Sequence, residues 1–73
     1  MSAEGMVQIF RRILETEEVD SNSDFFTVGG DSLLATRVLS AVAKEYGTEL
    51  SFAEFVNAPT PRGLSERVLR SGS

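Results

Sequence analysis

The sequence predicts an all-α fold, a bundle of four helices in which the third is short and the first connection is a long loop. Two observations support this prediction. Apolar residues recur at helical spacing in separate stretches, and residue types that begin or end helices stand at the borders of those stretches. Nothing in the chain resembles a strand. With 73 residues there is room for a single domain, residues 1–73, whose structured core should run from about residue 6 to residue 70.

The first helix is expected from Met6 to Glu15. At about 100° per residue, its apolar side chains fall on one side of a helical wheel. We interpret Arg11 and Arg12, on the other side, as part of the solvated face. The predicted inner side consists of Met6, Val7, Ile9, Phe10, Ile13 and Leu14.

A long loop is expected from Thr16 to Asp31. Residues 20–24 are turn-forming types, and the Gly29-Gly30 pair breaks any helix. Loops of this length are uncommon in compact domains and often functional. Four apolar residues should pin this loop to the bundle, and we expect both phenylalanines to lie in the core: Val19, Phe25, Phe26 and Val28.

The second helix should run from Ser32 to Tyr46 and end at Gly47 in a left-handed cap. On a helical wheel Leu33 falls on the outer side, in line with Arg37 and with Thr36, Ser40 and Lys44. The predicted buried side consists of Leu34, Ala35, Val38, Leu39, Ala41, Val42 and Tyr46.

Two further helices follow. Ser51 and Glu54 have the spacing of a capping box, which begins a short helix that closes before Pro59. Thr60 and Pro61 are typical of the start of a last helix. Apolar residues available to the core are Phe52, Phe55 and Val56 in the third helix and Leu64 and Val68 in the fourth, and the tail from Ser71 should be frayed.

Composition excludes several classes of function. The net charge is −4, and one lysine and six scattered arginines form no basic run, which disfavours nucleic-acid binding. No apolar stretch approaches the ~20 residues that span a membrane, and no secretion signal begins the chain. Without cysteine there is no thiolate metal site, and without histidine neither a serine hydrolase nor a zinc site is favoured. We expect a cytoplasmic protein without bound metal.

Two other kinds of site, a calcium-binding loop and the nucleophile elbow of a hydrolase, match the sequence in and next to the long loop only in part. Asp20, Asn22, Asp24 and Asp31 occupy ligand positions of a calcium-binding EF-hand loop, but Phe25 stands where the sharp turn needs glycine. A nucleophile elbow needs glycine two residues on either side of the serine, and Leu34 stands at the second of these positions.

The stretch Asp24-Phe25-Phe26-Thr27-Val28-Gly29-Gly30-Asp31-Ser32-Leu33-Leu34 resembles the attachment signature of carrier proteins. It is most similar to the peptidyl carrier domains of nonribosomal peptide synthetases, whose pattern is an acidic residue, one or two phenylalanines, then Gly-Gly, His or Asp, Ser and Leu. Fatty-acid and polyketide carriers usually have a single glycine there. The Pro-Thr-Pro before the last helix also fits, so the resemblance covers roughly residues 6–70.

This resemblance implies a non-catalytic carrier. In the family, a separate phosphopantetheinyl transferase moves 4'-phosphopantetheine from coenzyme A to the serine, and the arm's thiol then holds amino-acyl, peptidyl or acyl groups as thioesters. The matching residue is Ser32, within an attachment motif that includes Gly29, Gly30 and Asp31. The implied setting is nonribosomal peptide or mixed polyketide biosynthesis, as a monomer loaded by adenylation, condensation or other synthetase enzymes.

The residues themselves agree with an attachment site. A helix N-terminus favours an anion such as a phosphodiester by ~0.3–1 kcal/mol, and we expect Gly29 and Gly30 to clear bulk from beside Ser32. Asp31 and Ser32 are also both good N-cap residues, so capping alone would account for them without the flanking pattern.

Because carriers of this type present the start of this helix to partners, we expect Leu33 to be an apolar anchor for partner enzymes and Arg37 a charged neighbour. The alternative for the whole chain is a helical protein-interaction module without a prosthetic group. Both a discrete carrier and a domain of a synthetase stay open, and we favour the discrete form.

Overall fold

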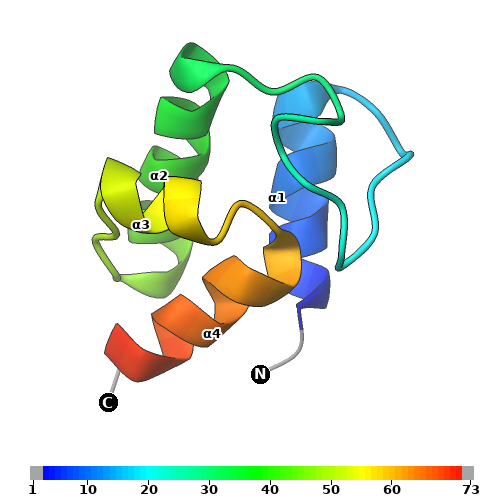
Figure 1. Ribbon diagram of the computed structural model, residues 1–73. Coiled ribbons are helices and arrows are strands. Elements are labelled where there is room, and N and C mark those ends of the chain that lie inside the picture. Colours follow the sequence, from blue (N-terminus) through cyan, green and yellow to red (C-terminus); the bar gives the residue numbers. More distant parts are fainter. Residues whose placement is uncertain (1–2, 72–73) are drawn as a thin grey trace.

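The computed structural model describes residues 3–71, which form four helices: α1 (Glu4–Leu14), α2 (Ser32–Tyr46), α3 (Phe52–Asn57) and α4 (Pro61–Ser71). Helices α1 and α2 lie side by side and run in opposite directions, and the long loop passes over the end where α1 stops and α2 starts (Figure 1). The short α3 packs on α2, and α4 packs on α1 at the opposite end of the bundle. This architecture confirms the predicted fold class.

The ends of the helices follow local backbone chemistry. Helix α1 ends at Glu15, which takes the left-handed conformation with φ 55° and donates its amide to the Arg11 carbonyl. Gly47 closes α2 in the same conformation, with φ 66°, as its lack of a side chain predicts. Helix α4 continues through Ser71, so the prediction of a frayed tail is wrong for that residue, and residues 72–73 lie outside the described part of the chain.

Three buried phenylalanines join elements that are far apart in the sequence. The Phe25 ring, from the long loop, meets the Phe10 ring of α1 edge-on at a centroid distance of 5.1 Å. It meets the Phe55 ring of α3 edge-on at 5.0 Å. All three side chains are fully buried, so the loop supplies part of the core instead of covering it.

The backbone of the loop is fixed as well. The Phe25 amide donates to the Pro59 carbonyl at 2.7 Å, and the Arg62 amide donates to the Ser21 carbonyl at 3.0 Å. Nε and Nη2 of Arg11 both donate to the Val19 carbonyl, at 3.2 and 2.9 Å. Arg11 therefore does more than the solvated role expected from the sequence, because it holds the first half of the loop against α1.

The apolar loop residues divide between core and surface. Val19 and Phe25 are buried and Val28 packs against the core, as predicted. The expectation that Phe26 is a core residue is wrong, since 38% of it is exposed. Its ring lies over Phe25 and Phe55, with centroid distances of 5.5 and 5.8 Å, and covers the core from outside.

Helix α3 likewise buries less than the sequence suggested. Its capping box is formed, with the Ser51 hydroxyl accepting from the Glu54 amide and the Glu54 carboxylate accepting from the Ser51 amide. A helix of six residues presents only one inward face, however, and Phe55 alone occupies it. Phe52 and Val56 point away from that face and are exposed.

None of the helices in the described part of the chain combines the length and the apolar character that crossing a membrane requires.

Candidate attachment site at the start of helix α2

A tight turn leads into the site. The Asp24 carboxylate accepts from the amides of Phe26 and Thr27 at 2.9 and 3.2 Å, and the Asp24 carbonyl accepts from those of Thr27 and Val28, both at 3.1 Å. This hydrogen bonding curls the chain around Asp24. As a consequence the two neighbouring phenylalanines face different ways, Phe25 toward the core and Phe26 toward the surface.

The two glycines serve different purposes. Gly29 has φ +109°, a conformation that residues with side chains rarely adopt, and the space around its missing Cβ is empty. Gly30 has an ordinary φ, but a Cβ there would overlap ring atoms Cδ2 and Cε2 of Phe25. The expectation that both glycines clear bulk beside Ser32 therefore does not describe Gly30, whose missing side chain makes room for Phe25, and it stays a prediction for Gly29. Gly30 instead allows the backbone to lie directly on the Phe25 ring.

Asp31 is the N-cap of α2. Its backbone is extended, with φ −136° and ψ −177°, and its carboxylate accepts from the Leu34 amide at 2.9 Å. Ser32 follows as the first residue of the helix and is exposed to solvent. Its carbonyl accepts from the Thr36 hydroxyl, but its own hydroxyl makes no hydrogen bond to any residue that the structure describes. The cap is thus Asp31 alone, which leaves the Ser32 oxygen available for chemistry.

The outer face of α2 is open, as the helical wheel predicted. Leu33 is 66% exposed, and Thr36, Arg37, Ser40 and Lys44 are exposed beyond it. Leu33 therefore has no role in the core.

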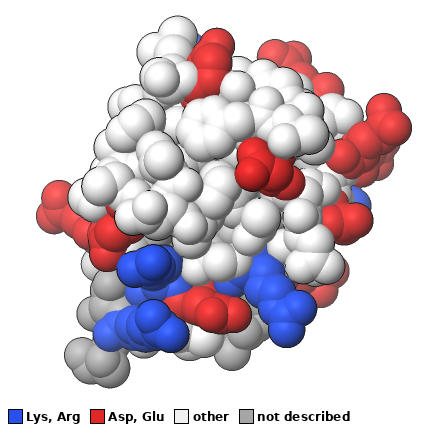
Figure 2. Space-filling view, in the orientation of Figure 1, with Lys and Arg blue, Asp and Glu red and all other residues white. Residues whose placement is uncertain are grey.

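Further exposed apolar side chains lie on neighbouring elements, and from the sequence they are expected in the core. They are Phe26 in the loop and Phe52 and Val56 in α3. Figure 2 shows that the face carrying α3 is largely uncharged, with acidic groups around it and basic groups gathered toward α4. The signal for these residues would have been the shortness of α3, which cannot bury three large apolar side chains on one face.

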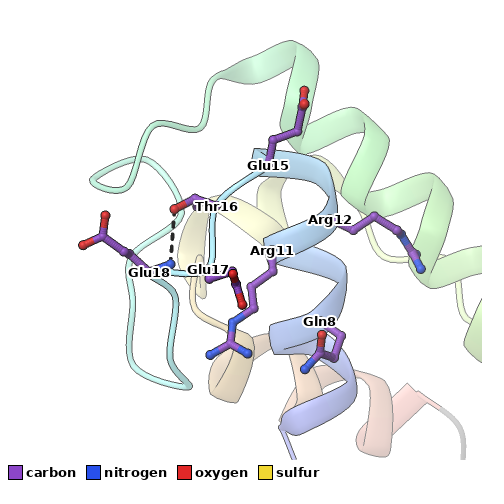
Figure 3. Close-up of a pocket in the computed structure, with 7 residues that line it drawn as sticks. All are labelled: Gln8, Arg11, Arg12, Glu15, Thr16, Glu17 and Glu18. Carbon is purple, nitrogen blue, oxygen red and sulfur yellow. Dashed lines mark hydrogen bonds between the residues drawn. The ribbon is translucent and has the colours of Figure 1, made fainter.

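A broad open hollow of about 590 Å³ lies elsewhere, along α1 and the first residues of the loop (Figure 3). It is lined by Gln8, Arg11, Arg12, Glu15, Thr16, Glu17 and Glu18. Its two arginines have partners nearby: Arg11 donates to the Val19 carbonyl, as above, and Arg12 pairs with Glu45 at 2.6 Å. No residue of α2 lines this hollow, so it is separate from Ser32.

The acidic side chains at the EF-hand positions each form hydrogen bonds within their own turn. The carboxylates of Asp20, Asp24 and Asp31 each accept backbone amides of their own turn, from Asn22, from Phe26 and Thr27, and from Leu34 respectively. Across the residues that the structure describes, no three acidic, histidine or cysteine side chains gather as a metal site would require.

Ser32 is exposed in the first turn of α2, and its hydroxyl makes no hydrogen bond to a described residue, so this oxygen is accessible from solvent. Comparison with known proteins identifies the class. Residues 4–68 match the family model described as the phosphopantetheine attachment site. The chain belongs to this family, and it is a non-catalytic carrier domain for phosphopantetheine of the type found in nonribosomal peptide synthetases.

Related sequences agree with this family assignment. A probable non-canonical nonribosomal peptide synthetase, CymA of Salinispora arenicola, is 41% identical over 64 residues, which are 88% of this chain and 1% of that protein. A dimodular nonribosomal peptide synthase of Bacillus subtilis is 37% identical over 63 residues, 86% of this chain and 3% of that protein. The chain therefore spans only 1% to 3% of the length of these two relatives.

Two solved structures share the fold. An active-site mutant of a peptidyl carrier protein superposes with a TM-score of 0.93 at 27% identity, covering 97% of this chain and 79% of the other. A chain from the complex of the phosphopantetheine transferase Sfp with coenzyme A and a peptidyl carrier protein gives a TM-score of 0.91 at 27% identity, covering 96% and 91%. The site of the present chain fits the prosthetic group, because Ser32 is exposed and its hydroxyl makes no hydrogen bond to a described residue.

Proposed function

We propose that Ser32 is the residue that carries phosphopantetheine, and that the chain holds amino-acyl, peptidyl or acyl groups on that arm during nonribosomal peptide or mixed polyketide biosynthesis. The observation that supports this assignment is the division between Asp31 and Ser32. Asp31 takes the capping position, so the exposed Ser32 hydroxyl is left without any hydrogen bond in the described structure.

The modification is a phosphoryl-type transfer that the carrier undergoes and does not catalyse. The Ser32 oxygen bonds to the phosphorus next to the pantetheine of coenzyme A, the pyrophosphate bond breaks, and adenosine 3',5'-bisphosphate leaves. The serine proton passes to the transferase or to water. The arm, once attached, supplies a thiol that forms thioesters. On the carrier side, the helix N-terminus favours the new negative charge.

We further propose that partner enzymes recognise the exposed face around Ser32. Leu33 supplies an apolar anchor and Arg37 a positive charge on the next turn of α2. The exposed Phe26, Phe52 and Val56 add apolar area on the adjoining loop and on α3. The expected partners are a phosphopantetheinyl transferase and adenylation, condensation or other synthetase enzymes. The cytoplasmic setting expected from the sequence stays a prediction.

Mass spectrometry of the purified chain, after incubation with coenzyme A and a phosphopantetheinyl transferase, tests the assignment of Ser32. The parent chain should gain the mass of one phosphopantetheine group, and Ser32→Ala should gain none. Ser40→Ala is the matched control, because Ser40 is an exposed serine on the same face of α2, and it should be modified like the parent. Modification of Ser32→Ala would refute the assignment, and an unmodified parent would favour the interaction module without a prosthetic group.

A further inference from the structure

The backbone of Phe25 is fixed in space more firmly than its place in a loop suggests. Its ring is fully buried between Phe10 and Phe55. Its amide donates to the Pro59 carbonyl at 2.7 Å, and its carbonyl accepts from the Gly30 amide at 2.9 Å. Phe25 is therefore tied at the same time to α1, to α3 and to the connection before α4.

The backbone of Gly30 packs directly against Phe25, with no room for a side chain between the two residues. A Cβ on Gly30 would overlap the Phe25 ring and would lie 2.7 Å from the Phe25 carbonyl oxygen. The Gly30 backbone thus rests on both the ring and the carbonyl of Phe25. No residue with a side chain can take this place unless the loop or the ring moves.

The contact between Phe25 and Gly30 lies directly before the N-cap of α2. Only Asp31 separates Gly30 from Ser32, and the Asp31 carboxylate and carbonyl are fixed to the first turn of the helix by the amides of Leu34 and Ala35, at 2.9 and 2.8 Å. A shift of Gly30 away from Phe25 would be passed on through this rigid turn to Ser32.

We propose that Phe25 and Gly30 are positioning residues for the modification of Ser32. The Phe25 ring and carbonyl form a support on which Gly30 rests, and this support presents the Ser32 hydroxyl at a fixed place to the transferase. The inference rests on the proposed function, in which Ser32 is the modified residue. Gly29 has a different task, since its positive φ forms the turn and its surroundings are empty.

Steady-state kinetics of phosphopantetheine transfer test this role, with coenzyme A, a phosphopantetheinyl transferase and the purified chain as acceptor. Gly30→Ala should lower kcat/KM for the chain about tenfold or more, because displacing a reacting group by about 1 Å can cost 10²-fold in rate. The loss should fall mainly on kcat, since no side chain of the exposed face proposed to bind the transferase is replaced. Phe25→Leu, combined with Gly30→Ala, removes the overlap with the ring but not the close approach to the carbonyl of residue 25, and should restore part of kcat.

A control separates positioning from a loss of stability. Val68→Ala removes buried apolar volume from α4, at the opposite end of the molecule from Ser32 (Figure 1). It should lower the melting temperature but leave kcat/KM unchanged, with all rates measured well below the melting temperature of each variant. If Gly30→Ala fails to fold, Phe25→Leu alone replaces it, and its kcat/KM should fall although that of an equally destabilised Val68→Ala does not.

The proposal is overturned if Gly30→Ala, or Phe25→Leu in its place, is modified with the kcat/KM of the parent chain. It is also overturned if kcat/KM follows the melting temperature across all variants, Val68→Ala included. Failure of the proposed function has a different signature, which is a parent chain that is not modified or a Ser32→Ala variant that is.

Discussion

At the scale of single residues, Asp31 and Ser32 divide two tasks that either side chain could perform. Both residue types are good N-caps, and a cap holds the first amides of a helix that have no partner within it. The Asp31 carboxylate takes this task by accepting from the Leu34 amide, and Ser32 begins the helix with its hydroxyl free. A serine engaged as the cap would have to give up that hydrogen bond before it could be modified. The division therefore leaves the proposed attachment oxygen without a hydrogen bond, while the carboxylate of Asp31 caps the helix.

This division predicts different effects on stability for two neighbouring substitutions. Asp31→Ala removes the cap and should lower the free energy of unfolding by ~1 kcal/mol, whereas Asp31→Asn keeps a capping oxygen and should lose far less. Ser32→Ala should leave the free energy of unfolding nearly unchanged, because the serine does not cap the helix. Urea denaturation followed by circular dichroism measures all three. A Ser32→Ala variant as unstable as Asp31→Ala would show that the serine is the working cap.

At the scale of elements, the outer face of α2 predicts a separation between binding and folding. Leu33→Ala and Arg37→Glu should slow modification by a phosphopantetheinyl transferase, or loading by an adenylation enzyme, because they remove an apolar anchor and reverse a charge. Both side chains are exposed, so the melting temperature should hardly change. Glu49→Gln, a charge change at an exposed residue outside α2, is the control. Unchanged transfer and loading in both α2 variants would contradict the proposed partner surface.

Much of this element structure could be predicted from the sequence, because the signals are local. Helical periodicity placed α1 and α2 to within a few residues, and the Ser51 capping box and Gly47 cap form as predicted. Apolar character, in contrast, does not say which way a side chain points. Phe26 was therefore misplaced, since the turn around Asp24 directs it outward.

At the candidate site, too, some features could be predicted from the sequence and others could not. The motif around Ser32 indicated the proposed attachment residue, because its spacing is specific. The different uses of the two glycines could not be predicted, since one depends on a backbone angle and the other on a ring that arrives from the folded core. Likewise, Asp31 is the cap and Ser32 is not because the backbone is still extended at Asp31, and the residue types alone did not decide between the two.

At the scale of the whole molecule, the fold depends on a small number of side chains that connect distant segments. A domain of this size buries a modest core, and proteins of this kind are stable by only ~5–15 kcal/mol. Phe10, Phe25 and Phe55 bring α1, the loop and α3 to one point, and all three are fully buried. Losing one of them affects three elements together, so we expect unfolding to be cooperative across the chain.

Helix α3 offers a matched pair of substitutions that tests this dependence, since it carries one buried and one exposed phenylalanine. Phe55→Ala leaves a cavity beside Phe10 and Phe25 and should cost ~3–5 kcal/mol, which could remove most of the stability of the domain. Phe52→Ala makes the same chemical change on the same helix, but 44% of Phe52 is exposed, so the cost should be much smaller. Thermal unfolding followed by circular dichroism and by near-ultraviolet absorbance compares the two. Equal melting temperatures for the two variants would mean that the aromatic cluster does not hold α1, the loop and α3 together.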